Sequence, residues 1–161
     1  MKRKNRTAIL VCVAALLAVG MVGCGRSSDA PQAAGDEIQL IIRLDLKEDI
    51  GLLIIDHDLG GNKGSGGISN ADRSMIKRDD VLYWTFDKQY YDNPADTADL
   101  TLRFTVVTEY CDPNYDNIYP EEYMIPMEAV SFRADFGKAY SVTIAGDKDK
   151  GYQAVLGEPP A

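Results

Sequence analysis

Strict alternation of apolar and polar residues is the feature that most limits the folds open to this chain. From residue 38 to residue 47, every second side chain is large and aliphatic, and residues 100–107 repeat the pattern with Leu100, Leu102, Phe104 and Val106. A period of two places successive side chains on opposite faces of an extended backbone. Both segments are therefore typical of half-buried β-strands.

Further short segments carry strand signals, whereas no helical pattern reaches ten residues. The apolar run 50–55 predicts a central strand, and the short polar break 47–49 predicts a hairpin between it and residues 38–46. The remaining predicted strands are 74–77, 81–86, 130–135, 140–144 and 152–156. About eight strands with turn signals between them predict an all-β fold, namely an antiparallel β-sandwich.

Residues 60–67 hold five glycines in eight positions. A phosphate-binding loop needs a Lys followed by Ser or Thr at the start of a helix, but Lys63 is followed by Gly64 and no helical period follows. This composition predicts a flexible surface loop.

The segment Asp135-Phe-Gly-Lys-Ala-Tyr140-Ser-Val142 is similar to the tyrosine corner of immunoglobulin-like domains. It departs from that pattern by one extra residue before Tyr140 and by the absence of a Cys two residues after it. The resemblance implies an immunoglobulin-like or transthyretin-like sandwich that lacks the antibody-type disulfide.

The chain begins with a basic segment, residues 1–6, followed by 16 apolar or glycine residues, 8–23, without a charge. This arrangement is typical of a secretory signal peptide. The apolar run is shorter than the roughly 20 residues that a helix needs to cross a bilayer.

The ending Met21-Val22-Gly23-Cys24 resembles the lipobox of bacterial lipoproteins, with Met in place of the usual Leu. The resemblance implies that residues 1–23 are removed and that the Cys24 sulfur receives a diacylglyceryl group. Residues 24–36 are then a lipidated Cys and a flexible polar tether, and residues 37–161 are the β-sandwich domain. The resemblance also implies an extracytoplasmic protein of the bacterial cell envelope, held at the membrane by acyl chains on Cys24.

Charge and cysteine content agree with this placement. Removing residues 1–23 lowers the number of basic residues from 17 to 13 against 25 acidic ones, a net charge of −12. Such a chain repels polyanions, so nucleic acid is excluded as a partner. Cys12 lies in the signal peptide and Cys24 accepts lipid, so Cys111 has no partner for an intramolecular disulfide, and we interpret it as a small packed side chain.

Two polar motifs invite chemistry. His57, the only histidine, lies between Asp56 and Asp58, but alternation along a strand turns its ring away from both carboxylates, and we interpret it as a strand-end histidine among solvated acids. The oxygen-bearing residues Asp112, Asn114 and Asp116 stand at alternate positions, as in the first half of a calcium loop. The second half departs from that pattern, which makes these three weak metal candidates and favours a turn.

Four tyrosines are clustered in a polar, proline-containing segment, and Tyr supplies rigid amphipathic contact area to recognition loops. They are the predicted binding surface: Tyr110, Tyr115, Tyr119 and Tyr123. The alternative is that the rings seal the end of the sandwich.

The sequence therefore predicts a lipid-anchored module that binds or scaffolds an envelope protein or glycan, without a catalytic residue, metal or cofactor. Two alternatives stay open. One is a small carboxylate-dependent hydrolase, with or without calcium. The other is a structural subunit of an envelope assembly held through an edge strand.

Overall fold

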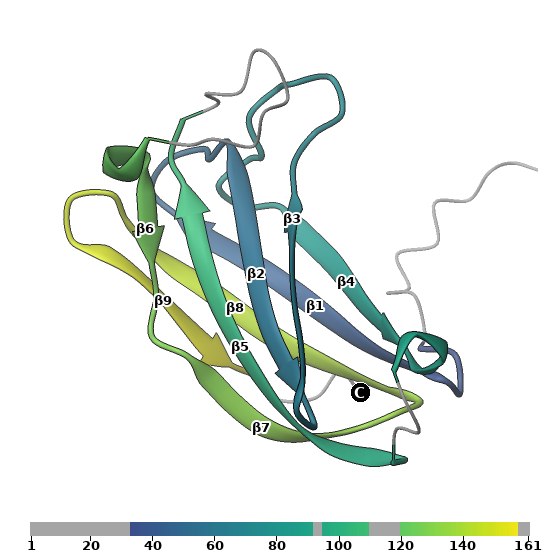
Figure 1. Ribbon diagram of the computed structural model, residues 1–161. Helices are drawn as coiled ribbons and strands as arrows, with labels where there is room; N and C mark the ends of the chain where they lie inside the picture. The colour runs from purple at the N-terminus through teal and green to yellow at the C-terminus, as the bar shows by residue number, and fades with distance from the viewer. Residues whose placement is uncertain (1–32, 92–94, 110–119, 158–161) are drawn as a thin grey trace, which may run out of the picture. The chain divides into compact units, whose positions relative to one another are not determined.

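The computed structural model describes residues 33–91, 95–109 and 120–157, and they fold into two β-sheets that pack face to face (Figure 1). Sheet 1 has the strand order β4 (Val81–Asp87), β1 (Glu37–Leu46), β8 (Lys138–Asp147), β9 (Gly151–Leu156). Sheet 2 has the order β3 (Asn62–Ile68), β2 (Leu52–Leu59), β5 (Thr97–Val107), β6 (Met124–Pro126), and β7 (Val130–Asp135) also pairs with β5. The all-β sandwich predicted from the sequence is confirmed; its immunoglobulin-like or transthyretin-like type stays a prediction.

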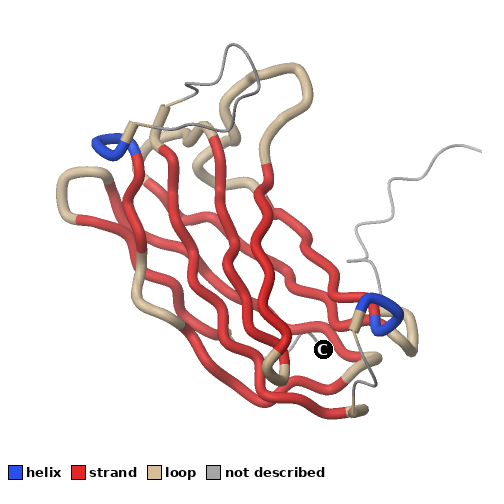
Figure 2. The backbone as a smooth tube through the Cα atoms, viewed as in Figure 1, coloured by secondary structure: helices blue, strands red, loops and turns tan. Residues whose placement is uncertain are grey.

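Two single-turn 3₁₀ helices interrupt the loops of the described chain, η1 (Lys88–Tyr90) and η2 (Glu121–Tyr123) (Figure 2). The side chain of Asp87 caps η1 by accepting a hydrogen bond of 3.0 Å from the Gln89 amide. Neither helix, nor any other in the part of the chain that can be described, is long and apolar enough to cross a membrane.

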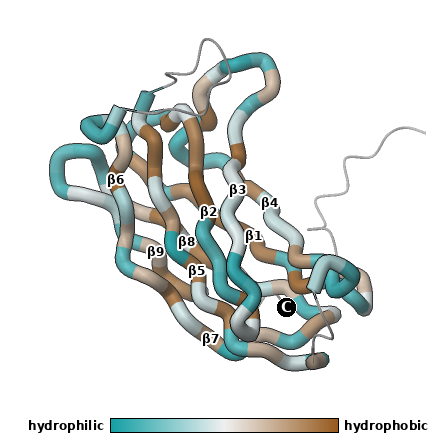
Figure 3. Tube along the Cα trace, viewed as in Figure 1, coloured by the Kyte–Doolittle hydropathy of each residue, from teal (hydrophilic) through white to brown (hydrophobic). Residues whose placement is uncertain are grey.

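The alternating residues form the core between the sheets. From β1, the side chains of Ile38, Leu40 and Ile42 are fully buried, and they meet Leu53 and Ile55 of β2 in one apolar cluster. Figure 3 shows hydrophobic positions alternating with polar ones along several of these strands. Burial of apolar surface, which stabilises the fold by about 25 cal/mol per Å² buried, is the main force that holds the two layers together.

The central position of β1 gives sheet 1 a mixed topology. β1 pairs with β4 in antiparallel register, with Leu40 opposite Trp84, and with β8 in parallel register, with Leu40 opposite Tyr140. The other ladders between the described strands are antiparallel, as predicted. The structure has nine strands in its described part where about eight were predicted.

The predicted hairpin between residues 38–46 and 50–55 is wrong. β1 and β2 belong to different sheets, and the segment 47–51 carries the chain across the sandwich. The Lys47 amide donates to Gly146 of sheet 1, whereas the Gly51 amide donates to Val107 of sheet 2. The crossing lets the apolar faces of both strands meet in the core, which a hairpin within one sheet would not do.

The glycine-rich segment predicted to be a loop is strand β3 instead. Gly60 and Gly61 form a two-residue turn with φ values of 58° and 92°, the left-handed conformations that connect hairpin strands with the correct twist. β3 then pairs with β2 along its whole length, from Leu59 opposite Asn62 to Leu53 opposite Ile68. Glycine carries no side chain to alternate, so the strand leaves no periodic signal.

The predicted strand at residues 74–77 is also wrong. This segment makes a single bridge, between Ile76 and Ile50, inside a longer loop that joins β3 to β4. Ile76 is fully buried, so its apolar character reflects an anchor point of the loop and not a ladder.

Tyr140, in the segment that is similar to a tyrosine corner, bonds back to the backbone of β7. The Tyr140 hydroxyl accepts a hydrogen bond of 2.8 Å from the Asp135 amide, which lies before the turn between β7 and β8. Because β7 belongs to sheet 2 and β8 to sheet 1, this bond ties together the two layers at the turn.

Gly146 offers a test of the β8–β9 hairpin. Its φ is 133°, and a Cβ there would collide with the Gly151 carbonyl oxygen and lie 2.9 Å from Cα of Tyr152. We expect Gly146→Ala to lower the free energy of unfolding by about 2 kcal/mol or more, measured by urea denaturation, because both strain and a backbone clash oppose it. Gly35→Ala is the control, since nothing lies within 4 Å of a Cβ there. Equal stability of the two variants would contradict the geometry.

Candidate functional site

The strand directions divide the loops between two opposite ends of the sandwich (Figure 1). β1 begins at one end, together with η1, the β2–β3 turn and the β7–β8 turn; we call this the N-terminal end. β1 finishes at the other end, where segments 47–51, 69–80, 120–123 and 148–150 lie; we call this the loop end. The longest described loop, residues 69–80, is therefore at the opposite end of the domain from residues 34–37, where β1 begins.

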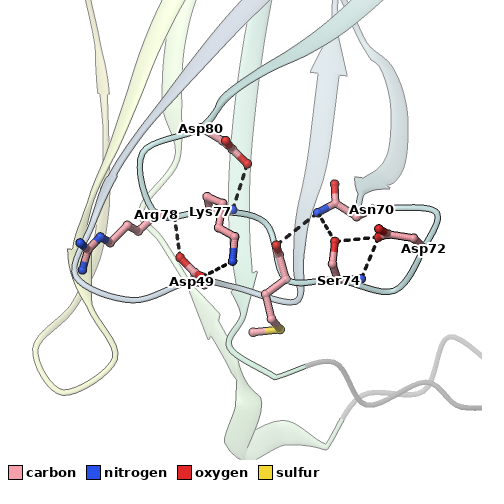
Figure 4. Close-up of polar contacts among 8 residues, drawn as sticks. Asp49, Asn70, Asp72, Ser74, Lys77, Arg78 and Asp80 are labelled. Carbon is pink, nitrogen blue, oxygen red and sulfur yellow. Dashed lines mark hydrogen bonds and ion pairs between the residues drawn. The ribbon is translucent and has the colours of Figure 1, made fainter.

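The first half of loop 69–80 is held by its own polar side chains (Figure 4). Asp72 accepts hydrogen bonds from the Ser74 amide, at 2.9 Å, and the Ser74 hydroxyl, at 2.6 Å. Asn70 donates to the Ser74 hydroxyl and to the Met75 carbonyl oxygen. The bonds from Ser74 favour the ionised carboxylate and lower the pKa of Asp72.

Asp49 connects the second half of this loop to segment 47–51. Its carboxylate accepts hydrogen bonds from Lys77 Nζ, at 2.8 Å, and from the Arg78 amide, at 3.0 Å (Figure 4). The Asp80 carboxylate accepts a hydrogen bond of 2.9 Å from the Lys77 amide. The hydrogen bond from Lys77, followed by the one from the Arg78 amide, holds the pKa of Asp49 below its ordinary value. A surface ion pair alone is weak, but two donors converging on one carboxylate also fix the loop backbone.

Glu48, the residue before Asp49, connects the same segment to the β8–β9 hairpin. One carboxylate oxygen accepts a hydrogen bond of 2.7 Å from the Lys148 amide and a second hydrogen bond from the hydroxyl of Tyr152. Burial of Tyr152, followed by its bond to Glu48, raises the pKa of this tyrosine well above its ordinary value. Segment 47–51 thus connects two neighbouring loops through hydrogen bonds that restrain them.

One residue of the predicted tyrosine surface lies in the described chain. Tyr123 is the last residue of η2 at the loop end, and it is half-buried. Its carbonyl oxygen accepts a hydrogen bond of 2.9 Å from the Thr108 amide. Tyr110, Tyr115 and Tyr119 lie outside the described residues, so the surface stays a prediction. Tyr90, by contrast, is 80% exposed at the N-terminal end.

His57 is placed differently from its predicted strand-end position. β2 continues through Leu59, so the ring points inward from the middle of a paired strand and meets the Phe86 ring edge to face, at 4.9 Å between centroids. Asp56 and Asp58 lie on the opposite face, as alternation predicts, and none of the carboxylates in the described residues is buried. A His-carboxylate pair is not formed there.

The other predicted site residues cannot be placed. Cys24, Cys111, Asp112, Asn114 and Asp116 lie outside the described residues, and their roles stay predictions. Among residues that are described, no group of three or more His, Cys, Asp or Glu side chains is arranged to hold a metal ion.

Glu48 and Asp49 are the residues that sequence reasoning missed, because it treated them as part of a polar turn. The available signal was two adjacent acids between two apolar strands. Their bonding partners are 28 to 104 residues away in the chain, and nothing local indicates them.

Comparison with known proteins places the chain in no family. No family model matches it, and no curated protein matches its sequence. Among solved structures, a non-hemolytic pneumolysin from Streptococcus pneumoniae strain ST306 shares 10% identity with a TM-score of 0.38, over 77% of this chain and 24% of that one. Listeriolysin O shares 7% sequence identity with a TM-score of 0.38, over 78% of this chain and 23% of that one. The chain spans about a quarter of the length of these proteins, and the likeness is too low to carry an argument.

Removing the Asp49 carboxylate tests the brace. We expect Asp49→Ala to speed amide hydrogen exchange several-fold at Lys77 and Arg78, while the core strands stay protected. In the unchanged protein this protection is complete above the ordinary Asp pKa of 3.8 and is lost as the pH falls through the lower folded-state pKa, because protonation removes the acceptor charge. Asp79→Ala is the control, since Asp79 is exposed and makes no hydrogen bond within the described chain. Identical exchange in both variants would contradict the brace.

Proposed function

We propose that this protein is a membrane-anchored lipoprotein of the bacterial cell envelope whose β-sandwich presents its loop end to a binding partner. The anchoring half of the proposal rests on the sequence: a basic start, 16 uncharged residues, and the lipobox-like ending at Cys24. Two acyl chains at this position give durable attachment, whereas a single chain binds a membrane only marginally.

The observation that supports the binding half is that residues 34–37, which end the proposed tether and begin β1, lie at the opposite end of the domain from the braced loops. The chain leaves the tether at the N-terminal end, where the Glu37 amide bonds to the Ala34 carbonyl oxygen and β1 begins. β1 is ten residues long, which corresponds to about 33 Å at the rise of a β-strand. An upright domain therefore carries the loop end about 30 Å farther from the bilayer than the point where the tether joins it.

The braced loops suit recognition better than chemistry. Loops that are held in place by a rigid scaffold bind at a lower entropic cost than loops that must be ordered on contact. The loop end has exposed polar and charged groups from segment 69–80, and Tyr123 adds a half-buried aromatic side chain at the same end. An envelope protein or glycan is the partner class that this mixture of aromatic and polar groups fits.

The anchor is tested on protein isolated from its native membranes. We expect intact-mass spectrometry to show a chain that starts at Cys24 and carries acyl chains on its sulfur. Cys24→Ser should move the protein from the membrane fraction to the soluble fraction while the domain stays folded. A chain that starts at Met1, or an unmodified thiol at residue 24, would contradict the anchor.

The binding surface is tested separately by photo-crosslinking in whole cells. A photoreactive amino acid replaces Asp79 at the loop end in one variant and Tyr90 at the N-terminal end in the other; both positions are exposed. We expect discrete higher-mass adducts from position 79 and none from position 90. Adducts from position 90 alone, or from neither position, would reject the loop end as the binding surface even if Cys24 is acylated.

A further inference from the structure

Two edge strands, β3 of sheet 2 and β4 of sheet 1, meet along one side of the sandwich through aromatic side chains. Trp84 points inward from β4 and lies against Gly66 of β3, where any Cβ would collide with Cη2 of the indole. His57 of β2 lies against Gly64, where a Cβ would be 2.5 Å from Cε1 of the imidazole. We call these four residues, together with Phe86, the seam.

The seam contains two polar atoms that are buried without a hydrogen-bond partner, Nδ1 of His57 and Nε1 of Trp84. A buried polar atom without a partner loses its bond to water and gains nothing in return. Both atoms would regain hydrogen bonds with water if β3 and β4 separated.

No charged group in the described chain faces the imidazole from the strands packed against it. Gly64 of β3, Leu102 of β5 and Phe86 of β4 approach the ring, and all three are uncharged. The charged residues of these strands lie at alternate positions, on the outer faces: Lys63, Asp87, Asp99, Arg103, and on β2 itself Asp56 and Asp58.

An imidazolium ion therefore fits this place poorly. Desolvation lowers the pKa of His57 below its ordinary value of 6.5 and outweighs the opposing attraction of Asp56 and Asp58. His57 is one strand away from the sheet edge, and the residue between it and the edge is Gly64, which has no side chain to block the ring. The ring has a short path to water across the edge strand.

We propose that the seam is an acid-sensitive latch: protonated His57 leaves Phe86 and moves out over Gly64, and β3 then separates from Trp84. Opening uncovers the inner face of β4 and loosens an edge strand that pairs only with β2. A freed strand edge beside an apolar face is the surface to which an extended segment adds. This device is independent of the lipid anchor and of the loop end.

The sequence supplies one histidine and one tryptophan, so both halves of the latch can be followed without labels. On the full-length protein in detergent, we expect the His57 Cε1 proton to titrate by NMR with a pKa below 6.5. Trp84 emission should shift to longer wavelength over the same pH range. Far-UV circular dichroism should keep its β-signal through this range, because only the edge strand moves.

The sign follows from linkage. A base whose pKa is lowered by folding stabilises the folded state fully above its ordinary pKa, and that stability is lost as the pH falls from there toward the folded-state value. Asp49 and Asp135, whose carboxylates accept hydrogen bonds, have pKa values below 3.8. Protonation of these two carboxylates is therefore a step distinct from protonation of His57.

Two variants act as controls. His57→Phe keeps an aromatic ring against Phe86 but cannot be protonated, so its Trp84 emission should not change between about pH 7 and pH 4.5. Gly66→Ala forces the indole to move and should show the long-wavelength emission already at pH 7.

Three results would overturn the latch: a His57 pKa at or above 6.5, a shift of Trp84 emission that persists in His57→Phe, and loss of the circular dichroism signal together with the emission shift. The NMR titration needs no variant, so the proposal stays testable even if His57→Phe fails to fold.

Discussion

The pairing of β1 with β4 on one side and with β8 on the other is the contact on which the rest of the described structure depends. Its inward side chains Ile38, Leu40 and Ile42 are completely buried, and Ile41 on the outward face is only 1% exposed. A strand that is paired on both edges and buried along its inner face has little freedom to move, although Arg43 and Asp45 of its outer face are exposed. The N-terminal end and the loop end are the two ends of this one strand.

The loop end depends on β1 through the segment that follows it. Glu48 and Asp49 are neighbours in the chain but bond in different directions, Glu48 to the β8–β9 hairpin and Asp49 to loop 69–80. Each of the segments 47–51 and 69–80 buries one isoleucine, Ile50 and Ile76, which form a bridge, and carboxylates that accept backbone amides hold the polar residues around them. The domain is thus held by two kinds of force: apolar packing between the sheets and charge-assisted hydrogen bonds at the loop end.

The sequence predicts those elements whose signal is local. Alternation of apolar residues identifies β1 and β5 directly, because one buried face imposes a period of two on the chain. It does not tell whether consecutive strands lie in one sheet or on both sides of the core, and so the hairpin at residues 47–49 was wrong. β3 was missed because Gly64 and Gly66 have no side chains to show a pattern.

The candidate site was less predictable than the fold for a related reason. A tyrosine-rich segment stands out in the sequence, but the braces that prepare the loop end come from two acids whose partners are remote in the chain. The sequence predicted a His57 ring at a strand end, facing away from Asp56 and Asp58, and the ring does lie on the face opposite these carboxylates. Its contact with Phe86 depends on the packing of one sheet on the other, which no local pattern contains.

The glycines of β3 and the aromatic residues of the seam explain each other. A strand with glycine at its inward positions is intrinsically weak, because glycine gains no packing and loses much backbone entropy. Trp84 and His57, from the two strands beside it, occupy the space that β3 leaves empty. Besides its ladder with β2, the strand depends on its contacts with those two rings, and one of them is a histidine that can gain a proton in acid. At the loop end, the hydrogen bonds of Asp49 lower its pKa below the ordinary Asp value of 3.8, so the proposed response of the seam to acid and the response of this brace depend on different groups, an imidazole and a carboxylate.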